Sequence, residues 1–390
     1  MDAPRQEVPH GTVILVSADG FRWDYVDRGI TPNAQRLMDS GVRGDLVPSF
    51  PTKTFPNHYT LVTGLYPDHH GIVANSFWDP RRRERFSMYD RAKVQDGSWW
   101  GGEPVWVTAE RNGRATAPLF WPGSEAAIDG VRPSHWLPYD GRMSNSARVD
   151  WILGLLDLGG PERPVFLTLY FSDTDDLGHA FDPDTDAVNE AIVAVDDAIG
   201  RLIDGIEARG LWSTVNVIFV ADHGMTPIRN DQVIFLDDYI DLSRAEIADW
   251  NPVVAIWPHD GEEESIYAAL ASVHPRMHVY LRADLPARLH YGTSARVAPI
   301  TGIADAGWSI TSHAYHEAER ARFAGGNHGY DPEVEDMRGV LIARGPALRE
   351  GVRIGTIENV HVYRLVMEVL GLPPVPSDGS LLALEEMLAR

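Results

Sequence analysis

The chain alternates between short continuous apolar runs and longer segments in which apolar residues recur every three or four positions. Continuous runs are typical of buried strands of a parallel sheet, whereas the longer period predicts amphipathic helices. We expect strands within residues 12–20, 164–173, 215–224 and 337–348, and helices within residues 31–41, 57–65, 147–160, 185–210, 262–274 and 359–371. This alternation predicts an α/β fold with a mostly parallel central sheet sandwiched by helices.

Two regions interrupt this alternation. Residues 76–140 are rich in Gly, Pro, Trp and Arg, and residues 250–325 carry shorter strand-like pieces. No linker-like segment separates either region from its surroundings. We therefore interpret both regions as excursions that shape a pocket, within a single domain over residues 8–385.

Composition narrows the range of partners. The chain has 34 Lys and Arg against 56 Asp and Glu, a formal charge of -22, which argues against binding a nucleic-acid duplex or an anionic membrane. It has no cysteine, which excludes disulfides, thiolate metal sites and a cysteine nucleophile. No apolar run approaches the roughly 20 residues of a transmembrane helix. No pattern in the sequence predicts an oligomeric state.

Carboxylates and histidines gather where the predicted strands end. In open α/β sheets the carboxyl ends of the strands are where ligands bind. Aspartate and histidine suit Zn²⁺, and two ions about 4 Å apart suit in-line displacement at phosphorus. Each signal alone is weak and more typical of an ordinary turn or structural residue, but their combination favours a metal site. The candidates lie in "VSADG", "SDTDDLGH", "VADHG" and "GGNHGYD": Asp19, Asp175, His179, Asp222, His223 and His328.

The other histidines carry weaker signals. We expect His69 and His70, in "YPDHHG", to be turn or surface residues, and His274 and His278 to be structural. The last pair shares a possible helical face without an obvious carboxylate partner: His313 and His316.

The stretch "SFPTKTFPNHYTLVTG" raises a choice about its threonines. Thr52 or Thr54 could cap the helix that follows, or Thr54 could be a nucleophile. A threonine hydroxyl is a poor nucleophile because it is protonated, but metal coordination favours the alkoxide. The free N–H groups at a helix start attract anions, so a phosphate could contact the Phe55 N–H. Beside a metal pair, the nucleophile interpretation is favoured.

Several stretches, in this order, resemble the nucleotide pyrophosphatase/phosphodiesterase family of the alkaline phosphatase superfamily. "KTFPNHYTLVTGLYP" is the most specific of them, and the chain is similar to a minimal, bacterial single-domain type. The matching stretches are "DGFR" (19–22), "PTKTFPNHYTLVTGLYPDHHGIVANSFWDP" (51–80), "DDLGH" (175–179), "ADHGM" (221–225), "LHYG" (289–292) and "NHGYD" (327–331).

The resemblance implies an alkaline-phosphatase-like fold with two Zn²⁺ ions and a role for each matching position. Thr54 corresponds to the nucleophile, and Asn75 works with the Phe55 N–H to hold a non-bridging oxygen. Phe55 and Tyr139 correspond to the pair that sandwiches a nucleobase, and Tyr170 and Tyr291 line the same pocket. The implied zinc ligands are Asp19, Thr54, Asp222 and His223 for one ion, and Asp175, His179 and His328 for the other.

The implied reaction is hydrolysis of a nucleotide phosphodiester or pyrophosphate through a threonyl-nucleotide intermediate, which releases a nucleoside 5′-monophosphate. One alternative is a phosphodiesterase of choline-containing (lyso)phospholipids, but the aromatic, Arg-rich residues 76–140 favour nucleotides. A phosphate monoesterase, a sulfatase and an inactive binding protein are further alternatives. The polar N-terminus lacks a signal peptide's apolar region. We expect a periplasmic or secreted protein whose export signal has been removed, with a cytoplasmic one as the alternative.

Overall fold

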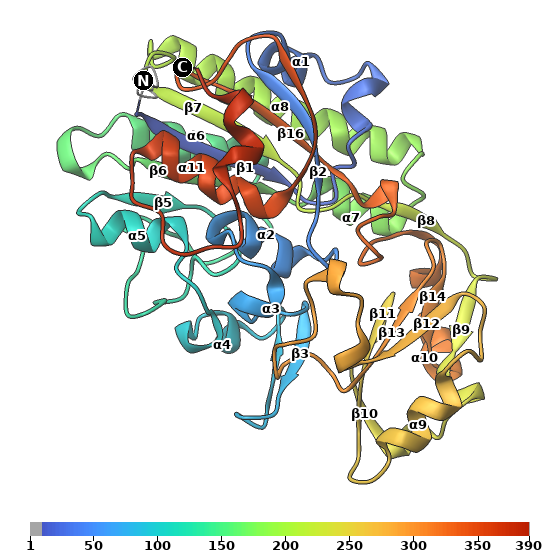
Figure 1. Cartoon of the computed structure of the whole chain (residues 1–390). Helices are drawn as coiled ribbons and strands as arrows, with labels where there is room; N and C mark the ends of the chain where they lie inside the picture. The colour runs from blue at the N-terminus through green and yellow to red at the C-terminus, as the bar shows by residue number, and fades with distance from the viewer. Residues whose placement is uncertain (1–9, 390) are drawn as a thin grey trace, which may run out of the picture.

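The computed structural model describes residues 10–389 and contains a seven-stranded central sheet in the order β17-β2-β16-β7-β1-β6-β5 (Figure 1). β16 is antiparallel to both of its neighbours, and the other four pairings are parallel. The predicted α/β fold with a mostly parallel sheet is therefore confirmed. The strands are β1 (Thr12–Ala18), β2 (Val42–Val47), β5 (Thr116–Pro118), β6 (Phe166–Phe171), β7 (Val215–Val220), β16 (Gly339–Arg344) and β17 (Val352–Glu358).

β1 lies between β6 and β7 and is buried on both faces. Val13 and Leu15 pack into one hydrophobic core, whereas Ile14 and Val16 pack into a second core on the opposite face. Both sets are apolar because helices cover both faces of the sheet, which explains why the strand has a continuous apolar run.

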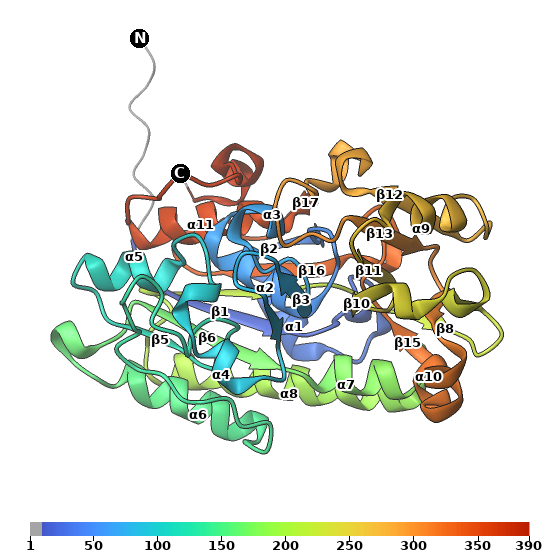
Figure 2. The same ribbon diagram turned by 90° about the horizontal axis from the view of Figure 1, so that it is seen from below.

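The helices form a layer on each side of the central sheet. Figure 2 shows α6, α7 and α8 along one side and α2, α3 and α11 along the other. All six helices predicted from the sequence are present. The helices are α1 (Pro32–Asp39), α2 (Thr54–Thr63), α3 (Pro67–His70), α4 (Arg91–Val94), α5 (Val105–Arg111), α6 (Asn145–Leu156), α7 (Asp173–Ala180), α8 (Asp186–Ala208), α9 (Glu263–Leu270), α10 (His313–Ala318) and α11 (Val362–Leu370).

A second, four-stranded antiparallel sheet lies beside the central one in the order β10-β11-β13-β12 (Figure 1). It has its own hydrophobic core, which includes Val254, Ile256 and Ile300. The strands of this sheet are β10 (Ala245–Asp249), β11 (Val253–Pro258), β12 (Met277–Leu281) and β13 (Ile300–Ala304). Three small pairs complete the strands: β3 (Ser76–Asp79) with β4 (Glu84–Ser87), β8 (Thr226–Ile228) with β15 (Gly325–Asn327), and β9 (Val233–Phe235) with β14 (Ser309–Thr311).

Two partly buried ion pairs join the regions expected to be excursions to the rest of the chain. Lys53, just before α2, pairs with Asp249 at the end of β10. Arg296 donates from Nε to Asp79 Oδ2 at 2.9 Å, which connects the second region to the first. Residues 76–140 also supply β5, the edge strand of the central sheet. Within residues 10–389, no helix has the length and apolar character needed to cross a membrane.

One expectation about the histidines is wrong, and the structure shows a contact for another histidine that the sequence does not reveal. His70, expected in a turn or at the surface, is fully buried at the end of α3, and its Nε2 lies 3.1 Å from Thr60 Oγ1. Burial lowers the pKa of His70 to about 3, so the ring is neutral. His313 does have a carboxylate partner, because its Nε2 lies 2.9 Å from Asp238 Oδ1.

Candidate active site

The first group of candidate ligands lies at the carboxyl ends of two adjacent parallel strands. Asp19 follows β1, and Asp222 and His223 follow β7. His223 Nε2 is 3.3 Å from Asp19 Oδ1 and 3.0 Å from Asp222 Oδ2. All three residues are buried, and the Gly20 N–H donates to Asp222 Oδ1 at 3.2 Å. The parallel pairing of β1 and β7 therefore brings together residues about 200 positions apart.

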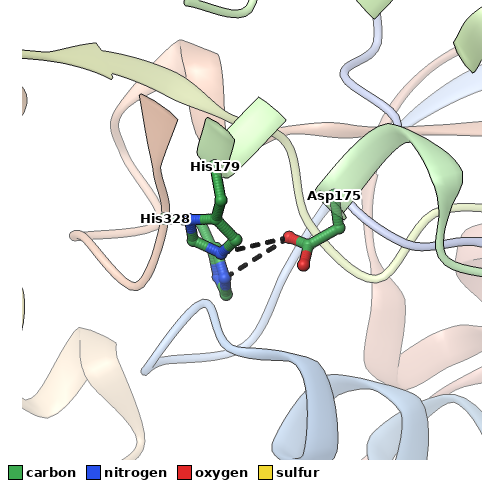
Figure 3. Close-up of side chains that lie close together, drawn as sticks. All are labelled: Asp175, His179 and His328. Atoms are coloured by element: carbon green, nitrogen blue, oxygen red, sulfur yellow. Dashed lines mark ion pairs between the residues drawn. The ribbon is translucent and has the colours of Figure 1, made fainter. Parts of the chain in front are cut away.

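The second group combines α7 with a glycine-rich loop (Figure 3). Asp175 and His179 are four residues apart on α7, and His328 follows β15. The Nε2 atoms of His179 and His328 lie 3.5 Å and 3.6 Å from Asp175 Oδ1. The rings of His223 and His328 stack with their centroids 3.6 Å apart, so the two groups adjoin.

Thr54 is the first residue of α2 and lies next to the first group. Its Oγ1 is 3.5 Å from Asp19 Oδ1 and 3.4 Å from His223 Nε2. The residue in the N-cap position is Lys53, which makes no side-chain cap, and the Thr52 hydroxyl bonds to the Tyr330 carbonyl. The interpretation of Thr52 or Thr54 as a simple helix cap is therefore wrong.

The three candidate histidines share one hydrogen-bonding pattern. Nδ1 lies next to a backbone carbonyl in each: Gly326 at 3.1 Å for His179, Gly224 at 2.9 Å for His223 and Thr52 at 2.8 Å for His328. A carbonyl oxygen only accepts, so Nδ1 carries the proton and Nε2 is left free for a metal ion. Burial also lowers the pKa of His179 to about 4 and that of His328 well below its usual range. Both rings are neutral, as metal ligands must be.

The carboxylates of both groups fit metal binding as well. Among the described residues, no group with suitable geometry donates a hydrogen bond to the buried Asp175 Oδ1. Asp222 Oδ2, in contrast, has His223 Nε2 at 3.0 Å and His58 Nδ1 at 3.3 Å. Burial raises the pKa of Asp175 well above its usual range, and burial with the Asp222 charge raises that of Asp19. An unpaired buried carboxylate is costly, and a bound cation removes that cost. The donor sets, Asp and His with one Thr, match the preferences of Zn²⁺.

The electrostatics of His223 point the same way. Burial lowers the pKa of this ring, but the adjacent Asp222 and Asp19 carboxylates more than offset burial and raise the pKa well above its usual range. These carboxylates therefore favour the protonated, positively charged form of the His223 ring. A metal ion between the same groups would supply that charge instead.

A cavity of about 450 Å³ opens beside Thr54. Its lining includes Phe55 and Asn75, and the Phe55 N–H donates to Asn75 Oδ1 at 2.9 Å. Tyr139 and Tyr170 also line the cavity. Tyr291 does not: its hydroxyl donates to the Val73 carbonyl at 3.0 Å. Three sequence-predicted site residues are therefore absent from the lining: Tyr291, Asp222 and His223. The last two still adjoin the cavity, because His223 Nε2 contacts Asp19, Asp222 and Thr54.

Comparison with known proteins identifies the family. The family model described as type I phosphodiesterase / nucleotide pyrophosphatase matches residues 13–331. The chain belongs to this family. The resemblance read from the motifs is therefore confirmed, and this nucleotide pyrophosphatase/phosphodiesterase is a hydrolase of phosphoric ester and anhydride bonds.

Relatives cover nearly the whole chain. Human ectonucleotide pyrophosphatase/phosphodiesterase family member 5 is 37% identical over 96% of this chain and 78% of its own length. Mouse bis(5′-adenosyl)-triphosphatase enpp4 is 38% identical over 95% of this chain and 79% of its own. The solved structure of murine ectonucleotide pyrophosphatase/phosphodiesterase 5 has a TM-score of 0.92 at 36% identity and covers 97% of this chain and 100% of its own. The same murine protein is also solved as an inactive threonine-to-alanine variant in complex with AMP, with the same TM-score.

Two residues of this phosphodiesterase site and one contact of a third were not found from the sequence. Tyr170 was expected only to line the pocket, but its hydroxyl donates to Asp19 Oδ2 at 2.6 Å. His58, one helical turn after Thr54, donates from Nδ1 to the Thr54 carbonyl at 2.9 Å and lies 3.3 Å from Asp222 Oδ2. The four-residue spacing from Thr54 in "TFPNH" is the signal that could have revealed it.

Glu125 is the second residue that was not found from the sequence. It lines the cavity, is buried, and accepts the Tyr139 N–H at 3.0 Å while it also pairs with Arg91. It thereby fixes the backbone that carries one aromatic wall. Its partners lie up to 34 positions away in an irregular region, so no local pattern marks it.

Proposed function

We propose that this enzyme hydrolyses phosphodiester or pyrophosphate bonds of nucleotides and releases nucleoside 5′-monophosphates, with Thr54 as the nucleophile. The position of Thr54 Oγ1 carries the proposal, because it lies at a helix start, between Asp19 and His223, and beside an aromatic-lined cavity. Two relatives support it: the mouse bis(5′-adenosyl)-triphosphatase, and the inactive threonine-to-alanine variant that was solved with AMP.

The proposal includes two Zn²⁺ ions. Asp19, Thr54, Asp222 and His223 would hold one, and Asp175, His179 and His328 would hold the other; both acidic and histidine groups meet the geometric requirement for a metal site. When bound, the ions supply Lewis-acid stabilisation of the negative charge that develops on the phosphoryl oxygens.

Residues of the chain attack phosphorus, bind a non-bridging oxygen and bind the base. Thr54 Oγ1 forms an ester bond to phosphorus while the bond to the leaving group breaks, and water then hydrolyses the ester and restores the hydroxyl. The Phe55 N–H and the Asn75 amide, adjacent to Thr54, bind a non-bridging oxygen. Phe55 and Tyr139 stack on the base, an interaction worth about 1–3 kcal/mol per base in nucleic-acid systems.

The cavity favours a nucleotide over the alternative substrates. Its lining mixes aromatic rings with Glu125, Asp176 and Arg91, which does not suit the acyl chain of a phospholipid. A monoester would need a cation for its extra charge. Arg91 is the one arginine or lysine among the described residues of the lining, and Glu125 already pairs with it.

We also propose that the enzyme acts outside the cytoplasm. The ectonucleotide names of the human and mouse relatives support this location. The proposed location is either the periplasm or, for a secreted protein, the outside of the cell.

Substitution of Thr54 tests the mechanism. With zinc in excess, Thr54→Ala is expected to lower kcat/KM on p-nitrophenyl thymidine 5′-monophosphate by roughly three orders of magnitude or more. Thr54→Ser keeps a hydroxyl and is expected to retain partial activity. Mass spectrometry of quenched wild-type enzyme checks for the adduct on the Thr54 peptide. A Thr54→Ala variant within tenfold of the wild-type rate would show that the nucleophile is another group.

The substrate class has its own test. We expect kcat/KM on the nucleotide ester to exceed that on p-nitrophenyl phosphorylcholine by at least roughly tenfold, in line with roughly 1–3 kcal/mol of base stacking. The reverse order would favour a phospholipid substrate.

A further inference from the structure

Thr52 makes three hydrogen bonds to three consecutive residues of the loop that carries His328. Its hydroxyl donates to the Tyr330 carbonyl at 3.0 Å and accepts the Gly329 N–H at 2.9 Å. Its own carbonyl accepts from His328 Nδ1 at 2.8 Å. Thr52 is fully buried, so water does not compete for these bonds.

The loop that carries His328 depends on these hydrogen bonds because no long helix or strand fixes its backbone. β15, which precedes it, has only three residues, and Gly329 has a φ of 110°, outside the range of helices and strands. A Cβ at Gly329 would lie 2.7 Å from Pro252 Cδ and 3.1 Å from Lys53 Cε, so the loop packs closely against its neighbours. The direction of the His328 ring is therefore set by contacts with residues far away in the sequence.

We propose that Thr52 is a positioning residue for the second metal site, formed by Asp175, His179 and His328. The Thr52 hydroxyl holds the loop in place. The Thr52 carbonyl then lies next to His328 Nδ1, and His328 Nε2 faces Asp175 Oδ1 at 3.6 Å. This inference rests on the proposed metal function.

Different parts of the fold hold the two candidate metal-ligand groups, so loss of the Thr52 hydroxyl should affect one group and not the other. Asp19, Asp222 and His223 follow strands of the central sheet, whereas His328 sits in the loop bound by Thr52. Loss of the Thr52 hydroxyl should weaken the second site and leave the first unchanged. Thr54, a proposed ligand of the first ion, is only two positions after Thr52, but it belongs to α2. The hydroxyl of Thr52 bonds to Gly329 and Tyr330 instead.

Three substitutions separate this role from general stability. Thr52→Val removes the hydroxyl and keeps the carbonyl, and Thr52→Ser keeps both. Thr63→Val is the matched control. Thr63, the last residue of α2, is fully buried like Thr52. Its hydroxyl donates to the Tyr59 carbonyl at 2.7 Å and accepts the Leu65 N–H at 3.4 Å. Thr52→Ala removes the same hydroxyl with a smaller side chain and replaces Thr52→Val if that variant does not fold.

The experiment measures bound zinc per chain by elemental analysis during titration with a chelator of known zinc affinity. We expect two equivalents in the wild type. In Thr52→Val, the Kd of one equivalent should rise roughly 10–100-fold while the other is unchanged, as for other outer partners of metal ligands. Thr52→Ser and Thr63→Val should bind zinc like the wild type. The kcat/KM of Thr52→Val should fall in zinc-limited buffer and recover with added zinc.

Wild-type affinity for both equivalents in the hydroxyl-free variant would overturn the inference, as would equal weakening of both equivalents or the same loss in Thr63→Val. A wild type that binds fewer than two equivalents would overturn the metal proposal itself, and the inference with it. The two failures are distinguishable because only the second appears in the unsubstituted chain.

Discussion

Tyr170 combines two roles in one side chain: its ring lines the cavity and its hydroxyl donates to Asp19 Oδ2. Burial and the Asp19 charge raise the pKa of Tyr170 well above its usual range, so the hydroxyl keeps its proton throughout ordinary assay conditions. A fixed donor to one carboxylate oxygen leaves the other, Oδ1, to face Thr54 and His223.

Removal of the Tyr170 hydroxyl, a change of a single oxygen atom, tests its hydrogen bond to Asp19. Tyr170→Phe should lower kcat/KM or the zinc affinity roughly 10–100-fold, because Asp19 loses the contact that orients it. Tyr291→Phe is the matched control, since that hydroxyl donates to the Val73 carbonyl away from the cavity. Steady-state kinetics at fixed free zinc measures both variants. Equal activity of the two would show that the bond to Asp19 has no part in the reaction.

Single residues also show what sequence reasoning can reach. Asp19, Asp222 and His223 could be selected as candidate ligands because carboxylate and imidazole side chains at the ends of apolar strands are chemically distinctive. The Tyr170 hydroxyl could not, because a tyrosine inside an apolar strand looks like any core residue. His70 was misjudged because "DHHG" resembles a turn, whereas packing buries the ring against Thr60.

Gly20 controls how closely two secondary-structure elements approach. It follows β1 with a φ of 66°, and a Cβ there would lie 3.1 Å from the Asp175 Cα on α7. The absence of a side chain lets α7 pack against the end of β1, and this contact brings the two ligand groups together.

Gly20→Ala is therefore expected to impair the site beyond its effect on stability. Gly29→Ala is the control, because Gly29 also has a positive φ, 75°, but nothing within 4 Å of the added Cβ. Both variants should lose about 1 kcal/mol of unfolding free energy or more from backbone strain. Only Gly20→Ala should also lose kcat/KM and zinc. Thermal unfolding and elemental analysis distinguish the two effects, and parallel losses in both variants would contradict the expectation.

Elements differed in how well the sequence predicted them. Long periodic segments such as α8 were found, and α2 begins three residues before the expected start, at Thr54. The pairs β8 with β15 and β9 with β14 have three residues each and join segments about 75 to 100 positions apart. No local pattern marks such strands, because their pairing depends on the finished fold. β15 carries the loop of His328, so the second ligand group was predicted by residue type but not by element.

Metal removal should act on the whole molecule, because the candidate ligands connect β1, α7, β7 and the loop after β15. An ion that binds only the folded chain stabilises it by about 4 kcal/mol at a free concentration 1,000 times its Kd. We expect the Tm to rise by several degrees with free zinc and to fall on chelation. Calorimetry in zinc-buffered solutions measures this shift. A Tm that does not depend on free zinc would argue against structural coupling of the ions.

The Asp79–Arg296 pair joins residues 76–140, part of which lines the cavity, to residues 250–325, none of which do. Arg296 also donates from Nη1 to the carbonyls of Gly71 and Trp99, both at 2.8 Å, so one guanidinium holds three segments. Burial alone would raise the pKa of Asp79, but the Arg82 backbone N–H and the Arg296 guanidinium more than offset burial and lower it. The charged carboxylate is therefore the form that the folded chain favours.

This lowered pKa predicts how stability depends on pH. The contribution of Asp79 is complete above the unfolded value of about 3.9, and it is lost as the pH falls through the lower pKa of the folded chain. Asp79→Asn should therefore lose about 1–3 kcal/mol of unfolding free energy at pH 7 relative to the wild type, with a smaller difference near pH 3. Urea unfolding at both pH values measures the two differences. A difference that does not change between pH 7 and pH 3 would show that the charge of Asp79 does not hold these regions together.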